Sequence, residues 1–206
     1  MKILAVQSRM GIGDTVIFLP FIKALSKKFN SPISILVKEN SKANQYLHQT
    51  KYIDKILTLE RDNKTNNRHG GFFGIFKLAN DLKKYKFDKI FIFNSSLRFN
   101  LVAKISGIPQ IYQYPLFAKN KQHIIEAPKK FLKENLNLDI NEDPEVQIDN
   151  DSISKAAQKF QIDKNTTNIL LGIGGSGPTK RIPPKTFLSV IAVSYTHLRA
   201  HETHTN

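Results

Sequence analysis

The chain has 206 residues, of which 40% are hydrophobic and none is cysteine, and its formal net charge is +14. The apolar content is enough for a sizeable core and excludes wholesale disorder, while the lack of cysteine excludes disulfides, thiolate catalysis and cysteine-bound metals. No segment is apolar for long enough to cross a bilayer, so we expect a cytoplasmic protein. The basic surface suits nucleic acid, anionic lipid headgroups or phosphorylated substrates, and it is equally typical of a solvated surface that binds none of them.

Short apolar runs alternate with amphipathic runs through the first 136 residues. Strands are predicted at Lys2–Val6, Ile33–Val37, Lys55–Leu59, Lys89–Phe93 and Gln110–Tyr114. Helices are predicted at Thr15–Phe29 with a kink at Pro20, and at Lys42–His48, Phe72–Tyr85, Ser96–Ile105 and His123–Leu136. This alternation predicts an α/β fold, a Rossmann-like parallel sheet with helices on both faces. Ligands of such sheets bind beyond the carboxyl ends of the strands, here around residues 7–14, after Leu59, and at 94–98.

The composition turns acidic and polar between Asp139 and Asp151, which predicts that a first domain covers residues 1–150. A linker helix at Ile153–Phe160, a strand at Asn168–Ile173 and a helix that starts at Phe187 are predicted to follow. One strand and one incomplete helix cannot bury a core. We therefore expect residues 151–191 to be a linker helix and the truncated start of a second domain.

The last residues, 192–206, differ in composition from the lysine- and isoleucine-rich chain before them. Their sequence resembles the translation of a sequencing-library adapter, and we expect this tail to be artefactual. His197 and His201 would share one helical face, but two histidines without a third ligand do not predict a metal site. We expect no bound metal.

Two glycine-rich turns invite comparison with nucleotide-binding motifs. Gly11 and Gly13 match the first two positions of G-x-G-x-x-G, but Val16 stands where the third glycine belongs, which argues against a nicotinamide or flavin cofactor. In the second turn Pro178 replaces the lysine of the P-loop motif.

What remains of the second turn is a glycine-rich loop after a predicted strand. Four of its side chains could donate hydrogen bonds to a phosphate: Ser176, Thr179, Lys180 and Arg181. Backbone N–H groups together with two cations suit a diphosphate, although lysine–arginine pairs usually face water. Asp14 likewise has a structural and a functional interpretation. It is either the N-cap of the first helix or a carboxylate at the ligand-facing edge of the sheet that accepts a proton.

Two segments together resemble glycosyltransferase family 9, the ADP-heptose:lipopolysaccharide heptosyltransferases. They are Met10–Thr15 with Pro20 and the following helix, and Gly174–Pro183. The polar loop Asn94–Arg98 and the histidine at the start of a helix, His123, are also similar to the family. The resemblance implies a GT-B architecture, in which two Rossmann-like domains face each other and the first binds the acceptor.

By this resemblance Asp14 is the general base that activates an acceptor hydroxyl for an inverting transfer. Gly13, Ser176, Thr179 and Lys180 would bind an ADP-heptose-like nucleotide sugar, while Ser95, Arg98 and His123 would contact a lipid-linked saccharide acceptor. Neither a metal nor a cofactor is implied. The anionic lipid acceptor would also explain the basic charge through peripheral contact with the inner membrane.

The competing hypothesis is a non-catalytic Rossmann-like module that binds nucleic acid or a phosphorylated ligand. Common RNA-binding modules interleave aromatic and basic residues, which this sequence does not do, so we expect no nucleic-acid partner. A chain that ends its natural sequence near Ile191 would be an inactive fragment of the transferase.

Overall fold

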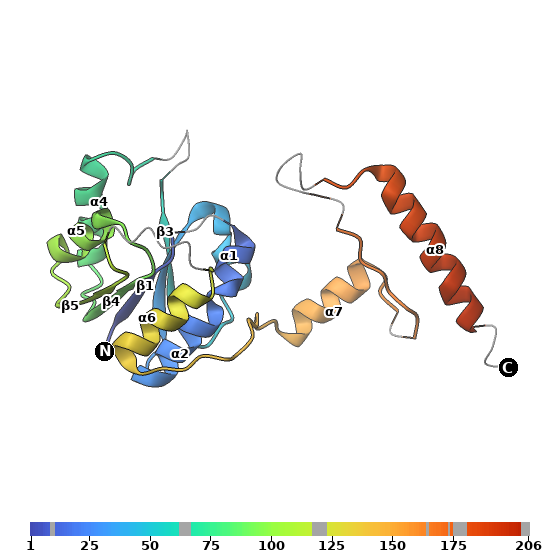
Figure 1. Ribbon diagram of the computed structural model, residues 1–206, viewed down its shortest axis with the longest axis horizontal. Coiled ribbons are helices and arrows are strands. Elements are labelled where there is room, and N and C mark those ends of the chain that lie inside the picture. Colours follow the sequence, from blue (N-terminus) through green and yellow to red (C-terminus); the bar gives the residue numbers. More distant parts are fainter. Residues whose placement is uncertain are drawn as a thin grey trace. The chain divides into compact units, whose positions relative to one another are not determined.

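The computed structural model describes residues 1–8, 11–61, 67–116, 123–163, 165–172, 174 and 181–202, and the side chains only as far as residue 196. The chain divides into two compact units, Met1–Ile153 and Ser154–Asn206, and each is described by itself (Figure 1). None of the described helices is long and apolar enough to span a bilayer.

The first unit is built on a five-stranded sheet in which every neighbouring pair of strands is parallel. Its strands are β1 (Ile3–Val6), β2 (Ile33–Lys38), β3 (Ile53–Leu59), β4 (Lys89–Ile92) and β5 (Gln110–Gln113). Their order is β3-β2-β1-β4-β5, so the chain changes direction across the sheet between β1 and β4. Val6 at the end of β1 pairs with Leu36 of β2 and with Ile92 of β4. The predicted parallel Rossmann-like sheet and its five strands are confirmed.

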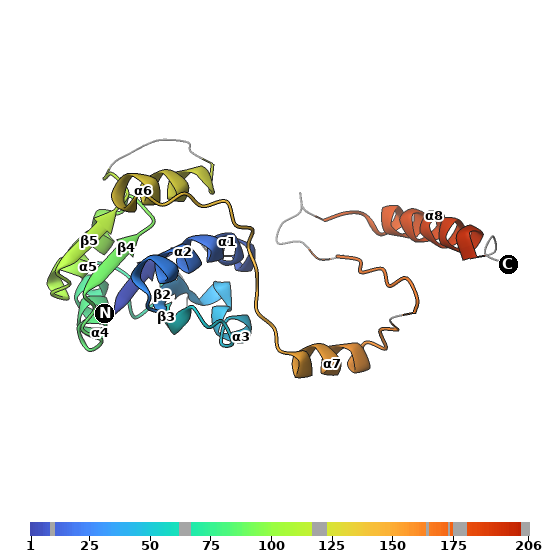
Figure 2. The same cartoon turned by 90° about the horizontal axis from the view of Figure 1, so that it is seen from below.

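Helices cover both faces of this sheet (Figures 1 and 2). The elements are α1 (Ile12–Ile17), α2 (Leu19–Phe29), η1 (Glu39–Ser41), α3 (Ala43–Tyr46), α4 (Phe73–Lys83), α5 (Leu97–Ile105) and α6 (Glu126–Leu136). One face, with Ile3 and Phe91, packs against α2 and α6. The other, with Leu4 and Ile92, packs against α4 and α5. Both faces of the central strands are buried, which explains why these strands are continuous apolar runs.

The first helix differs from its prediction. It begins three residues early, at Ile12, and stops at Ile17, and α2 follows from Leu19. Pro20 therefore lies in the first turn of α2, where its missing N–H costs no hydrogen bond, and it does not kink a continuous helix.

The second unit contains most of α7 (Asn150–Lys159), which starts in the first unit, and α8 (Pro184–Glu202). The helix predicted to begin at Phe187 is longer than expected, since it runs on into the tail. The strand predicted at Asn168–Ile173 is wrong for its described residues, 168–172, which form no strand. Leu170 is 97% exposed, so the apolar run alone does not produce a strand where no neighbouring strand pairs with it.

Asp149, at the end of the first unit, caps the first turn of α7. Its carboxylate accepts hydrogen bonds from Ser152 N at 2.6 Å and Ser152 Oγ at 2.9 Å, and from the amide of Gln49. The backbone N–H of Asp149 donates to Gln49 Oε1 at 2.8 Å. The bonds from Ser152, followed by that from Gln49, lower the pKa of Asp149 from 3.8 to about 2.

We expect Asp149→Asn to be less stable than the wild type at neutral pH, with a difference that closes in acid. A carboxyl whose pKa is lower in the folded state stabilises the fold above its unfolded pKa, and this contribution is lost as the pH falls from about 4 to about 2. Urea midpoints of both proteins across this pH range measure the effect. Asp143→Asn is the control, since the Asp143 carboxylate makes no hydrogen bond or ion pair with the described residues. A difference that stays constant down to pH 2 contradicts the assignment.

Candidate functional site

The carboxyl ends of β1 and β4 meet at the point where the strand order reverses. Gln7 and Ser8 follow β1 directly, and Asn94 is the second residue after β4. The Asn94 side chain joins the two segments, with Nδ2 donating to Ser8 Oγ at 3.1 Å. A crevice beyond such a reversal is the usual ligand site of an open α/β sheet. The structure thus brings together two of the three segments expected at this edge.

Asp14 lies at the same edge, as the third residue of α1. Gly11, and not Asp14, is the N-cap of α1, so the prediction of Asp14 as the N-cap residue is wrong. The Asp14 carboxylate nevertheless binds the cap residue, because Oδ2 accepts the Gly11 N–H at 3.1 Å. The side chain of Gln7 donates to the backbone carbonyl of Asp14 at 3.3 Å. Asp14 is half-buried, and its Oδ1 makes no hydrogen bond with any residue that the structure describes. The Gly11 N–H thus anchors one carboxylate oxygen, and among the described residues no donor occupies the other.

The two glycines beside Asp14 differ in what they require. A Cβ at Gly11 would lie 3.2 Å from Asp14 Oδ2, so a side chain there would press on the carboxylate. A Cβ at Gly13 would meet no atom of the described residues within 4 Å. Gly13 therefore leaves open space next to Asp14, which suits the close approach of a ligand, but the fold itself does not demand a glycine there.

Arg98 of α5 binds backbone, which sequence reasoning did not foresee. Its Nη1 donates to the carbonyl of Gly71 at 2.7 Å, and Nη2 donates to the carbonyl of His69. Burial, followed by the nearby charge of Arg61, lowers the pKa of Arg98. Gly74 is needed for this contact, because a Cβ there would lie 2.9 Å from Arg98 Nη2 and 2.3 Å from His69 C. Arg98 thus fixes the loop that precedes α4.

His69 holds the same loop from the other side and was missed in the sequence. The ring is buried, and Nδ1 accepts the Glu60 N–H at 3.1 Å, so the proton lies on Nε2, which is 3.2 Å from Asp81 Oδ2. Arg68 and Lys84 contact Asp81 Oδ1 at 2.8 and 3.3 Å. Burial raises the pKa of Asp81, but the His69 and Lys84 hydrogen bonds and the charge of Arg68 outweigh it and lower the pKa.

Ser95 and His123 are both near strand or helix ends but do not share a contact. Ser95 is half-buried in the loop after β4. His123 is exposed ahead of α6, and its Nδ1 accepts the Ile125 N–H at 3.4 Å. A further polar residue at this edge, Gln113, was missed. It ends β5 and donates to the carbonyls of Asn94 and Ser96 at 3.1 and 2.9 Å, and its place at a strand end was the available signal.

Most of the predicted phosphate loop falls outside the part of the chain that the structure describes. Ser176, Thr179 and Lys180 lie outside the described residues, as do the side chains of His197 and His201. Within the part of the chain that the structure describes, no group of three potential metal-ligating side chains occurs.

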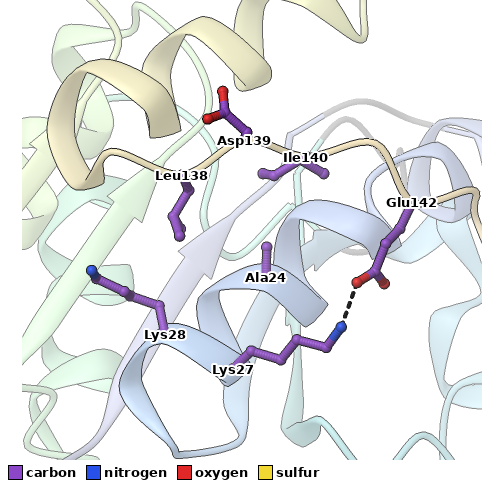
Figure 3. A pocket seen from close by; sticks show the side chains of 7 residues that line it. All are labelled: Ala24, Lys27, Lys28, Leu138, Asp139, Ile140 and Glu142. Carbon is purple, nitrogen blue, oxygen red and sulfur yellow. Dashed lines mark hydrogen bonds and ion pairs between the residues drawn. The ribbon is translucent and has the colours of Figure 1, made fainter.

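A pocket of about 320 Å³ lies at the other edge of the sheet, between the end of α2 and the segment after α6 (Figure 3). Glu142 accepts hydrogen bonds from Lys27 and, at 3.0 Å, from Lys23. The bond from Lys27, followed by that from Lys23, lowers the pKa of Glu142. Lys27 and Glu142, which both line the pocket, are thus paired with each other. The ion pairs fasten the chain as it leaves α6, far from the carboxyl ends of the strands.

No family model matches the sequence, and no curated protein sequence matches it. The five-stranded parallel sheet with its helices matches the GT-B glycosyltransferase fold of solved structures. The solved structures that show this include the glycosyl transferase family 9 from Veillonella parvula DSM 2008, with a TM-score of 0.72 and 18% identity over 92% of this chain.

Two Escherichia coli structures are also similar. ADP-heptose lps heptosyltransferase II has a TM-score of 0.61 and 18% identity over 89% of this chain. Heptosyltransferase WaaC with ADP-2-deoxy-2-fluoro heptose has a TM-score of 0.55 and 13% identity over 94% of it. The chain spans 58% of the Veillonella protein and of heptosyltransferase II, and 65% of WaaC.

Proposed function

We propose that this chain is the acceptor-binding part of an inverting glycosyltransferase that moves a heptose from an ADP-heptose-like donor to a lipopolysaccharide-core-type acceptor. The observation that carries the proposal is Asp14, a half-buried carboxylate at the carboxyl edge of a GT-B sheet. One of its oxygens accepts the N–H of Gly11, and the other accepts no hydrogen bond from the described residues. The names of the similar structures, two of which are heptosyltransferases, support the choice of sugar.

In the proposed reaction Asp14 removes the proton from an acceptor hydroxyl as its oxygen attacks the anomeric carbon of the sugar. The bond from that carbon to the diphosphate oxygen breaks, so the configuration inverts and the nucleoside diphosphate leaves with the electron pair. Lys180, with Ser176 and Thr179, neutralises the charge that develops on the diphosphate, and Gly13 leaves room for the sugar beside Asp14. We assign no metal and no cofactor to this step.

The acceptor would lie along the edge formed by the loops after β3, β4 and β5. Ser95 and His123 are the proposed contacts there, while Arg98 would act by fixing the loop at His69 and Gly71. We place the enzyme in the cytoplasm, with peripheral contact to the inner membrane. We also propose that the 206 residues alone transfer no sugar, since a donor pocket needs more of a second domain than residues 151–191.

Donor binding by the protein expressed from its complete reading frame tests the proposal. We expect a saturating concentration of ADP-heptose, about 100 times its Kd, to raise the melting temperature by about 5–10 °C. Product formation with a deep-core lipid acceptor is measured in parallel, and UDP-glucose is the control nucleotide sugar. The non-catalytic alternative predicts instead a salt-dependent gel shift with nucleic acid. No melting shift and no product with ADP-heptose would refute the transferase.

A further inference from the structure

The outer side of α4 carries three phenylalanine rings that the core does not use. Phe72, Phe73 and Phe76 are 69%, 76% and 47% exposed. Phe72 contacts the other two rings, with centroids 6.0 Å from Phe73 and 5.7 Å from Phe76. The helix already packs on the sheet through Ile75, Leu78 and Leu82, so the fold does not need these rings. Contiguous exposed aromatic surface of this kind marks an interaction site.

The same side of α4 is positively charged. Lys77 and Lys83 are exposed and make no ion pair with any residue that the structure describes. The single acidic residue of α4, Asp81, contacts Arg68, His69 and Lys84. We define the α4 patch as Phe72, Phe73, Phe76, Lys77 and Lys83. It combines aromatic rings with cations whose charge no acidic residue of the helix offsets.

Next to α4, α5 adds further apolar surface on the same face of the sheet. Leu97, Leu101 and Ile105, spaced four residues apart, are 47%, 38% and 44% exposed, and Lys104 lies between them in sequence. The two helices pack side by side through their buried residues (Figure 1). The layer they form thus presents exposed apolar residues and lysines on both helices.

We propose that the α4 patch docks the protein on an anionic lipid surface. Aromatic rings that enter the headgroup boundary, together with lysines that meet anionic headgroups, are the features of interfacial helices. Charge complementarity selects anionic lipid, because the exposed side of α4 carries cations and no unpaired acid. The inference rests on the proposed function, in which the acceptor is a lipid: α4 follows β3, so the rings at its start lie at the same edge of the sheet as Asp14.

Vesicle co-sedimentation of the protein from its complete reading frame tests the docking surface. The vesicles are phosphatidylcholine alone, or equal parts of phosphatidylcholine and phosphatidylglycerol. We expect binding to the mixed vesicles, a loss of about tenfold or more in partitioning for Phe73→Ser/Phe76→Ser, and a similar loss for Lys77→Glu/Lys83→Glu. The matched control, Ile148→Ser/Lys51→Glu, removes an exposed apolar side chain and reverses an exposed lysine elsewhere, and should bind within about twofold of the wild type.

Circular dichroism establishes that each variant is folded before it is compared. Wild-type protein that stays in the supernatant, or an aromatic variant that binds as the wild type does, overturns the proposal. A self-association that the aromatic variant abolishes, without vesicle binding, overturns it in favour of a second copy as the occupant. The assay contains no nucleotide sugar, and Asp14→Asn should bind vesicles normally, so failure of docking and failure of sugar transfer are distinguishable.

Discussion

Replacing Asp14 by asparagine in the protein from the complete reading frame should lower kcat for heptose transfer by about 10²–10⁴-fold. The amide has no basic oxygen to take the acceptor proton. Its carbonyl oxygen can still accept the Gly11 N–H, which Asp14 Oδ2 accepts at 3.1 Å, so α1 should remain capped and the fold intact. Initial rates at saturating donor and acceptor measure the effect, and KM for the donor should change little.

Two checks separate loss of the base from loss of the fold. The free energy of unfolding of Asp14→Asn should stay within about 1 kcal/mol of the wild type, the size of a single helix-cap contribution. Asp143→Asn, a carboxylate at an exposed position outside the sheet and its helices, should retain full activity. A kcat of Asp14→Asn within tenfold of the wild type would show that another group removes the proton.

Replacing Phe91 by alanine should destabilise the first unit by about 3–5 kcal/mol. Phe91 is fully buried in β4, and its ring stacks on Tyr112 with centroids 4.6 Å apart and an angle of 5° between the planes. Phe29 and Phe131 contact the same ring from α2 and α6 at 5.8 and 6.4 Å. Its removal leaves a cavity between the sheet and both helices that cover this face.

Urea unfolding of the two proteins at equal pH measures this loss. Phe72→Ala is the matched control, because its ring is 69% exposed, and it should change the free energy of unfolding by no more than about 0.5 kcal/mol. Equal effects of the two substitutions would show that Phe91 does not organise the core as the packing indicates.

The fold was largely predictable because the signals that define it are local. The central strands are short, largely apolar runs, such as Ile3–Val6 and Ile33–Val37, and strands buried on both faces require such runs. The break between α1 and α2 was not predicted. The pattern around Pro20 predicts a kink inside one helix. The signal for an earlier start is an acidic residue, Asp14, three positions after Gly11.

The apolar run at residues 168–172 shows the limit of local signals. It has the composition of a strand, but a strand exists only through its neighbours, and the described residues supply none for it. Composition and periodicity contain no information about which partners a segment finds.

The site was predictable only in part, for the same reason. The position of Asp14 after a strand and at the start of a helix is visible along the chain, but it fits a helix cap as well as a base. Only the resemblance to glycosyltransferase family 9 assigned Asp14 the role of base, which stays a prediction. The contacts of Arg98 with the carbonyls of His69 and Gly71, and those of Gln113 with the loop after β4, join residues 17 to 29 positions apart. Backbone acceptors have no sequence signature, so these roles emerge only from the folded chain.

We propose that the carboxylate of Asp14 takes the acceptor proton during sugar transfer. A single-turnover measurement with donor already bound isolates this step from substrate binding and product release. We predict that Asp14→Asn binds ADP-heptose as the wild type does and forms product at least about a hundredfold more slowly. Product formed at the wild-type rate within that single turnover would contradict the claim.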